Sequence, residues 1–222
     1  MHKTDSVLKA DVMEELRSDP TIKAIVVDVF VENGSVTLYG HASNYGEKLD
    51  VVRATKRVAG VLWIDDKLEI ELKDSQSRTD VDIAVEATKL LDNSMMFPAA
   101  SVTLTVSNGW ITLAGVVDWW YQRNAAEVYV RYQMGVKGVT NDITVRPKVE
   151  PVDVERTIRL AFVRNALLEA RNIHVEASGS TVTLKGLVNS FAERDEAERI
   201  AWSGPTVSEV DNQIKVDRQG NW

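Results

Sequence analysis

The chain has 222 residues, of which 44% are hydrophobic and 27% charged, and its formal net charge is −7. This composition is typical of a folded globular protein and excludes disordered and fibrous classes. Because cysteine is absent, disulfides, thiolate metal sites, cysteine nucleophiles and lipidated cysteines are also excluded.

Residues 1–74 predict the order helix, strand, strand, helix, strand. Apolar residues spaced by four predict the first helix, an Asn-Gly pair predicts a tight turn between the first two strands, and a capping box predicts the second helix. These signals are carried by Leu8, Val12 and Leu16 for the first helix, Asn33-Gly34 and Gly40 for the hairpin, Asn44 and Glu47 for the capping box, and Gly60 before the last strand.

The same order returns in residues 75–148. Helical spacing leads into a strand at 102–106, the pair Asn108-Gly109 supplies the turn, and a second strand closes at a glycine. At the start of the second helix the position that aligns with the capping residue is Trp119, so we expect Asp118 to supply the cap instead.

Residues 149–222 repeat the order a third time with a less regular turn. Ser178-Gly179 stands where the other copies have Asn-Gly, while Ser190 and Glu193 restore the capping box. The glycines that close the three second strands, Gly40, Gly115 and Gly186, lie 75 and 71 positions apart. That period is too long for a solenoid repeat and fits a small domain.

The chain is therefore predicted to be an α+β protein of three tandem αββαβ units, 1–74, 75–148 and 149–222, each a three-stranded mixed sheet packed with two helices. A polar run at 73–78 and a run with two prolines at 146–151 would link them. Units of this size rarely obtain more than ~3–5 kcal/mol from their own core, so we expect them to pack on one another or on a second chain.

The three units differ in charge. They carry 10 basic and 14 acidic groups, then 7 and 7, then 9 and 12, in chain order. Only the middle unit is neutral. The acidic total argues against nucleic acid as a partner, because phosphate contacts need clustered Lys and Arg.

The repeated pattern of a hydrophobic strand, Asn-Gly, Val-Thr-Leu-x-Gly, a helix opening near Glu or Gln followed by Lys or Arg, and a Gly-Val turn resembles the BON domain (bacterial OsmY and nodulation). The segments 120–123 and 135–141 lie at positions where that family has similar short sequence motifs. The resemblance covers the chain from about residue 5 to 217. It implies non-enzymatic binding modules without cofactors, associated with phospholipid or other hydrophobic ligands, osmotic stress and transport.

Neither catalysis nor metal binding is predicted. His2, His41 and His174 are far apart and none is followed by a second ligand at metal spacing. The sequence also has no Walker loop, nucleophile elbow or His-Glu-x-x-His motif. Repetition of one unit three times favours binding instead.

The middle unit has three consecutive aromatic residues at the start of its second helix, Trp119, Trp120 and Tyr121. At 100° per residue they cannot all face one core. They are expected either to pack against an adjoining unit or to meet an amphipathic ligand, with Arg123 as a partner for phosphate.

Two further tryptophans are candidates for a ligand surface or an interface. Trp202 ends the second helix of the third unit, and Trp63 lies in the last strand of the first unit. Trp63 and Ile64 are strand neighbours and so cannot both point inward. The apolar segment 95–98 is expected either to cover the edge of the core or to form an adaptable binding loop.

Two functions follow. The first is a binding protein for a phospholipid headgroup or another amphipathic ligand, and the alternative is a homo-oligomer that accommodates or passes small solutes. Acidic residues interrupt the first twenty positions, and no apolar run approaches the ~18 residues that span a bilayer. We therefore expect no integral membrane segment and a cytoplasmic location, with contact to a membrane surface left open.

Overall fold

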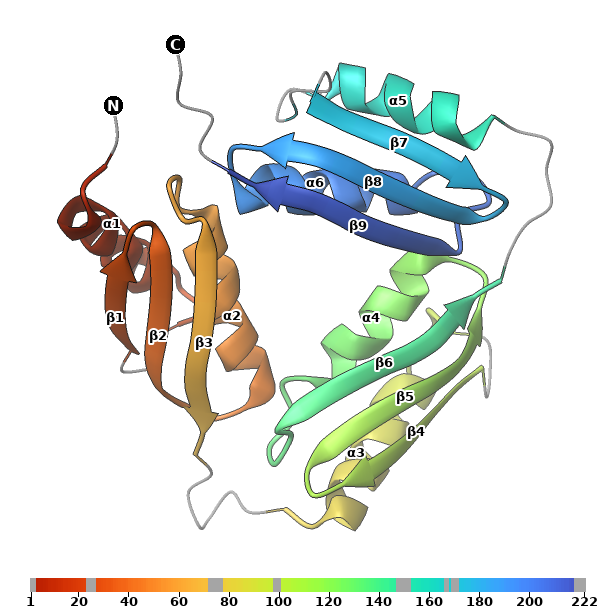
Figure 1. The fold of residues 1–222 in the computed structure, drawn as a ribbon. Helices are drawn as coiled ribbons and strands as arrows, with labels where there is room; N and C mark the ends of the chain where they lie inside the picture. Colours follow the sequence, from red (N-terminus) through yellow and green to blue (C-terminus); the bar gives the residue numbers. More distant parts are fainter. Residues whose placement is uncertain are drawn as a thin grey trace.

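A computed structural model describes residues 3–22, 27–71, 78–97, 101–146, 153–165, 168 and 172–217. These residues form three tandem α+β units with the predicted element order (Figure 1). Most of the two expected linkers, 73–77 and 147–151, lies outside the described residues, as do the first two residues of the strand expected at 25–31.

Each unit contributes two helices and three strands. Unit 1 contains α1 (Asp5–Ser18), β1 (Val27–Glu32), β2 (Ser35–Ala42), α2 (Tyr45–Arg57) and β3 (Trp63–Ile70). Unit 2 contains α3 (Asp80–Asp92), β4 (Val102–Ser107), β5 (Trp110–Val117), α4 (Trp120–Val130) and β6 (Gly138–Val145). Unit 3 contains α5 (Val154–Arg164), β7 (Ile173–Ser178), β8 (Thr181–Val188), α6 (Phe191–Trp202) and β9 (Glu209–Val216).

The second strand of each unit is the centre of its sheet. It pairs antiparallel with the first strand and parallel with the third, in the orders β1-β2-β3, β4-β5-β6 and β7-β8-β9. The register is the same in all three units, since Gly40, Gly115 and Gly186 face Val27, Val102 and Ile173 on the first strands. Equivalent positions can therefore be compared between units without ambiguity.

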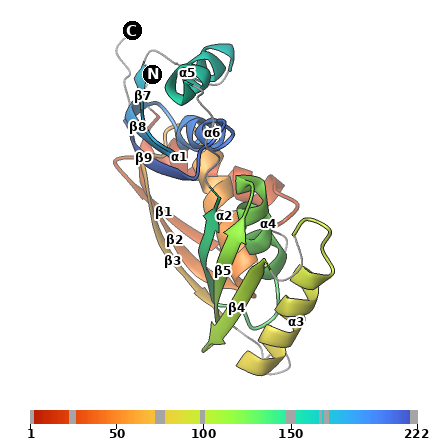
Figure 2. The ribbon, with the colours of Figure 1, turned by 90° about the vertical axis from the view of Figure 1, so that its right-hand side faces the viewer.

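One face of each sheet carries the two helices, and there the core forms. In unit 1 it gathers apolar side chains from α1, β2 and α2, among them Leu8, Leu38 and Val51, all fully buried. Figure 2 shows the three sheets on one side of the molecule and the helices on the other. The second face of every sheet therefore has no helix of its own unit on it.

The hairpin turns follow from their residues. Asn33 and Gly34 both have positive φ, as do Asn108 and Gly109, which is the geometry of a type I′ turn. The carboxylate of Asp5 accepts hydrogen bonds from the backbone N–H groups of the first pair at 2.9 and 3.3 Å. Asp80 does the same for the second pair at 2.7 and 2.8 Å.

Unit 3 builds its turn differently. Only Gly179 has positive φ there, as in a type II′ turn. The first residue of α5 is Val154, so it has no carboxylate to offer where Asp5 and Asp80 stand. The strand register places Gly179-Ser180, and not Ser178-Gly179, where the other units have Asn-Gly. This Gly-Ser turn and the missing aspartate occur together.

The glycine that closes each second strand is required by a close backbone approach. Gly115 has φ of 141°, and a Cβ there would lie 2.1 Å from the carbonyl oxygen of Ser101. At Gly186 the corresponding distance to the oxygen of Asn172 is 2.0 Å. No side chain fits at these positions.

The second helices α2, α4 and α6 join the units into a closed ring. They lie nearest the centre of the molecule, with α1, α3 and α5 farther out (Figure 1). The first residue of each second helix is aromatic: Tyr45, Trp120 and Phe191. Trp120 stacks on Trp202, the last residue of α6, and the ammonium group of Lys56 near the end of α2 lies over the ring of Phe191 at 5.7 Å. Tyr45 packs against the core of unit 2, and the N–H of the next residue, Gly46, donates to the oxygen of Arg131 just beyond α4 at 2.8 Å. The ring is thus a pseudo-threefold arrangement of head-to-tail contacts.

Candidate functional site

The six residues singled out in the sequence do not form one site. Trp119 and Tyr121 are exposed on unit 2, with 50% and 53% of their surface accessible. Trp63 is 66% exposed on the sheet of unit 1. Trp120 and Trp202 meet at the boundary between units 2 and 3, and Arg123 lies within unit 2. Each group has a separate role.

Trp120 and Trp202 stack on each other. Their ring centroids are 5.9 Å apart and their planes 16° from parallel. Trp202 also packs against the cores of both unit 2 and unit 3. Of the three consecutive aromatic residues, Trp120 packs against an adjoining unit. Its neighbours Trp119 and Tyr121 are exposed.

The guanidinium of Arg123 is used inside unit 2. Its Nε donates to the carbonyl oxygen of Ile143 at 3.0 Å, and its Nη2 donates to that of Asn141 at 2.8 Å. Arg194 makes the same pair of bonds from α6 to β9, at 3.1 and 3.3 Å. Recurrence in a second unit points to a structural role, tying the helix to the last strand. The geometry gives no support to Arg123 as a phosphate ligand.

The cap of α4 differs from the one predicted. The carboxylate of Asp118 accepts a hydrogen bond from Arg146 at 2.8 Å and does not cap the helix. The side-chain oxygen of Gln122 accepts instead from the backbone N–H groups of Asp118 and Trp119, at 3.1 and 3.0 Å. The prediction of an Asp118 cap was therefore wrong, because the neighbouring strand end offers that carboxylate a cationic partner.

Trp119 is the N-cap residue of α4. Further apolar side chains are exposed on the helix that follows. Tyr121, Val128 and Tyr129 are exposed on α4 within one sector of about 100°, as expected for positions separated by seven and eight residues. We call Trp119, Tyr121, Val128 and Tyr129 the α4 patch. Phe97 extends it, since its ring meets that of Tyr129 edge-to-face at 6.1 Å.

Where α4 has Val128, the other second helices have arginines that are held in ion pairs. On α2, Asp50 and Arg53 form an ion pair at 3.1 Å, and on α6, Glu196 and Arg199 form one at 2.7 Å. On α4 the corresponding residues are Ala125 and Val128. Since two sister helices carry an ion pair at these positions, the fold does not require apolar residues there.

Exposed large hydrophobic side chains also concentrate in unit 2. In chain order they are Val81, Val85, Leu90, Met95, Met96, Trp110, Val116, Trp119, Tyr121, Val128, Tyr129, Tyr132 and Met134. Unit 1 has Val7, Phe30, Tyr39 and Trp63, and unit 3 has Leu160 and Val163. Met95 and Met96 belong to the apolar loop noted in the sequence, and the backbone oxygen of Met96 accepts from the Gln122 amide at 2.7 Å. The loop is thereby fixed beside α4.

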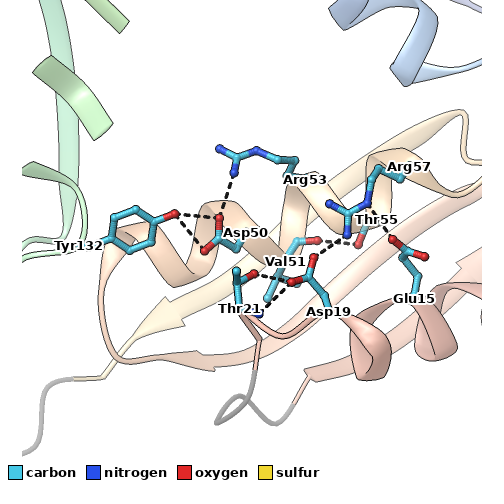
Figure 3. A network of polar contacts seen from close by, with 9 residues as sticks. All are labelled: Glu15, Asp19, Thr21, Asp50, Val51, Arg53, Thr55, Arg57 and Tyr132. Atoms are coloured by element: carbon cyan, nitrogen blue, oxygen red, sulfur yellow. Dashed lines mark hydrogen bonds and ion pairs between the residues drawn. The ribbon is translucent and has the colours of Figure 1, made fainter. Parts of the chain in front are cut away.

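Perturbed ionisable groups lie in structural networks. Hydrogen bonds from Thr21 and then from Arg57 lower the pKa of Asp19 to about 2 (Figure 3). Burial, with the nearby Glu127 carboxylate, raises the pKa of Tyr45 at the boundary between units 1 and 2. Within the described ranges there is no group of three or more His, Cys, Asp or Glu side chains that could hold a metal ion. In the same part of the chain, no helix is both long and apolar enough to cross a membrane.

Known proteins share the repeat. The BON domain family profile matches residues 4–71, 79–147 and 152–218. Osmotically-inducible protein Y of Escherichia coli (strain K12) is 28% identical over 148 residues, which covers 64% of this chain and 73% of that protein.

Two solved structures of CdsD, a structural protein of the type III secretion system of Chlamydia trachomatis, were also found. The first is 16% identical with a TM-score of 0.26, covering 96% of this chain and 94% of the other. The second, its C-terminal domain, is 16% identical with a TM-score of 0.24, covering 97% and 98%. At these TM-scores the likeness carries no argument. The family matches, by contrast, fall on the three units built from the same strand register and the same closing glycines, and the chain belongs to the BON domain family.

Proposed function

We propose that the protein is a non-enzymatic binding protein that takes a phospholipid or another amphipathic ligand on the α4 patch of unit 2. The observation that carries the proposal is the contrast between three equivalent helices. At the positions of Tyr121 and Val128, α2 has Gly46 and Arg53 and α6 has Ala192 and Arg199, whereas α4 exposes an aromatic ring and an apolar side chain there. Tyrosine and tryptophan side chains have an apolar body and a polar tip, which suits a boundary between water and lipid.

The charge of unit 2 supports the same surface. It carries equal numbers of acidic and basic residues, whereas units 1 and 3 are acidic. An acidic surface is repelled by anionic headgroups, so the neutral unit is the one that approaches a lipid surface at the lowest electrostatic cost. Because the Arg123 guanidinium is bonded to backbone oxygens, the proposed binding relies on apolar contact between the α4 patch and the ligand rather than on pairing of Arg123 with a phosphate.

Co-sedimentation with phosphatidylcholine vesicles tests the proposal. Replacement of Trp119 and Tyr121 by alanine removes two exposed rings and is expected to lower vesicle affinity about tenfold, because an interfacial aromatic contributes about 0.5–1.5 kcal/mol. The control is Trp63→Ala, which removes an indole that is still more exposed, at 66%, from another unit. Equal pelleting of the wild type and the double variant, or a comparable loss in the control, would defeat the proposal.

A link with osmotic stress is part of the proposal, supported by the name of the osmotically inducible relative. An increase in the amount of this protein after a rise in external osmolarity would support the link, and a constant amount would oppose it. The homo-oligomer and the cytoplasmic location stay predictions. Light scattering over a range of concentrations tests the first, and cell fractionation tests the second.

A further inference from the structure

The sheet of unit 1 has an aromatic open face. Phe30, Tyr39 and Trp63, one from each strand, are 57%, 50% and 66% exposed. Strand alternation puts them on the side opposite Val29, Leu38 and Ile64, which pack in the core. The helices of the unit cover the core side only (Figure 2). This face is separate from the α4 patch and independent of the function proposed for it.

The fold does not need these three rings. The shared register makes Phe30 equivalent to Thr105 and Glu176, and Tyr39 equivalent to Ala114 and Lys185. Trp63 is equivalent to Gly138 and Glu209. Two sister sheets thus form the same structure with small or charged side chains at these positions. Exposed aromatic rings that the fold can do without mark a contact surface.

Carboxylates lie between the rings. Asp28 and Glu32 flank Phe30 on the same face of β1, and Asp28 is directly opposite Tyr39 on β2. Neither carboxylate has an ion-pair partner among the described residues. The one lysine of the face, Lys67, is paired with Asp65 at 3.2 Å. The face therefore has unneutralised negative charge beside its rings.

In unit 3 the carboxylates of the matching face are engaged by neighbouring side chains, one of them by a cation. Glu176 pairs with Lys185 at 2.7 Å, Glu209 accepts from Thr181 at 3.0 Å, and Asp211 accepts from Gln213 at 2.6 Å. Unit 3 therefore has carboxylates on this face but no large exposed ring beside them. Unit 2 has one exposed ring on its open face, Trp110, and no carboxylate on its first strand β4.

We propose that the open face of β1, β2 and β3 binds an arginine-containing segment of a basic protein. A guanidinium can stack on an aromatic ring while its N–H groups bond a carboxylate, and cross-strand neighbours such as Asp28 and Tyr39 have Cβ atoms about 5 Å apart, close enough to serve one guanidinium together. Lysine, a compact and strongly hydrated charge, gains less from the rings. Anionic lipid and nucleic acid are repelled by Asp28 and Glu32, and a neutral ligand would gain nothing from them.

Calorimetric titration of the full chain with nona-arginine and nona-lysine peptides tests this proposal. The expected result is one site that prefers nona-arginine about tenfold and weakens as salt is added, with amide shifts in NMR confined to β1, β2 and β3. The variant with Phe30→Thr and Tyr39→Ala, which takes both residues from unit 2, is expected to lose the preference for arginine. Replacement of Asp28 by Asn and Glu32 by Gln is expected to weaken binding of both peptides about tenfold.

The charge control is Glu209→Gln with Asp211→Asn on the open face of unit 3, which changes the net charge by the same amount and is expected to change affinity less than threefold. Circular dichroism verifies that every variant is folded. Equal affinity of both peptides for all variants would mean general attraction to an acidic protein and would overturn the proposal. A concentration-dependent dimer that the aromatic variant abolishes, or vesicle binding lost in that variant, would overturn it in favour of a second copy or a lipid.

Discussion

The two ends of α4 meet their neighbours through different chemistry. At the beginning of the helix, Trp120 stacks on Trp202 of unit 3. Beyond its end, the Tyr132 hydroxyl donates to the carboxylate of Asp50 in unit 1 at 3.0 and 3.1 Å, and it accepts from Arg131 at 3.0 Å. Figure 3 shows the Tyr132 hydroxyl directed at Asp50, a residue that is only 5% exposed. One contact is apolar, and the other is a partly buried polar network.

This difference shows that the ring depends on where the helix ends lie rather than on one kind of contact. Backbone bonds support the polar end, since the N–H groups of Tyr45 and Gly46 donate to the oxygens of Val136 and Arg131 at 3.2 and 2.8 Å. An apolar stack needs no exact partner, whereas a buried carboxylate is costly once a partner is removed. The polar end should therefore be the more selective and the apolar end the more stabilising.

The largest expected effect comes from breaking the apolar end. Trp202→Ala removes a ring that packs on two cores and is expected to lower the free energy of unfolding by about 3 kcal/mol. Urea denaturation measures the loss, and near-UV circular dichroism reports the disappearance of the stacked pair. As a control, Trp63→Ala deletes an exposed indole and should cost less than about 0.5 kcal/mol. Similar losses of unfolding free energy for both variants would show that the stacked Trp202 stabilises the protein no more than an exposed indole does.

The polar end is expected to respond to Asp50→Ala with a loss of about 2 kcal/mol, because the Tyr132 hydroxyl loses its acceptor and Arg53 loses its ion-pair partner. Tyr132→Phe should cost about 1 kcal/mol, since Asp50 keeps its ion pair with Arg53. Combining the two substitutions gives a double-mutant cycle. Additive losses would indicate that the hydrogen bond has no coupling energy.

A smaller effect is expected from Gly46→Ala. A Cβ at this position would lie 2.1 Å from the Tyr132 ring, so the ring must move away from Asp50. Alanine also favours the helix over glycine by about 1 kcal/mol, and the net loss should therefore be about 1 kcal/mol. Ala192→Gly at the equivalent position of α6 measures the difference in helix propensity between alanine and glycine separately from the contact with Tyr132. A stabilised Gly46→Ala variant would show that the contact is dispensable.

The smallest effect concerns a polar network inside unit 1, away from both ends of α4. The pKa of Asp19 is about 2 in the folded protein, below its ordinary value of 3.8, so its contribution is full above pH 4 and is lost as the pH falls toward 2. Because solvent screens the exposed Arg57 side chain, we expect only about 0.5 kcal/mol. Asp19→Asn should flatten the dependence of urea stability on pH between 4 and 2. An unchanged slope would contradict the assignment.

Most of the fold was readable from local signals. The Asn-Gly turns, the closing glycines and the side-chain caps at Asn44 and Ser190 each act over a few residues, and the structure contains all of them. The reciprocal half of each predicted capping box is shifted, because Glu47 and Glu193 accept from the N–H groups of Ser43 and Asn189, one residue before the caps. The pairing of Asp118 with Arg146 was missed because it joins residues far apart in the chain. The cap that Gln122 supplies to α4 acts over three residues, and that local signal was overlooked. Local patterns predict local structure only.

The candidate site was less predictable. The three consecutive aromatic residues predicted that at least one of them lies outside the core of its unit. They did not predict that Trp120 stacks on Trp202 of another unit. Arg123 looked like a phosphate ligand because nothing in the sequence shows that the oxygens of Asn141 and Ile143 surround it. The available signal was the recurrence of a basic residue three positions after the first residue of each second helix, at Lys48, Arg123 and Arg194. Lys48 indeed donates to the oxygen of Leu68 at 2.6 Å.

The sequence by itself determined the threefold repetition, the order of elements and the faces of each sheet, because turn chemistry and apolar periodicity act within one unit. The tertiary structure decided how the units close into a ring and which aromatic side chains stay exposed. Those outcomes depend on contacts between residues far apart in the chain, such as Lys56 with Asp195 at 3.3 Å. No short-range pattern encodes such a pairing, since its free energy exists only after both units have folded.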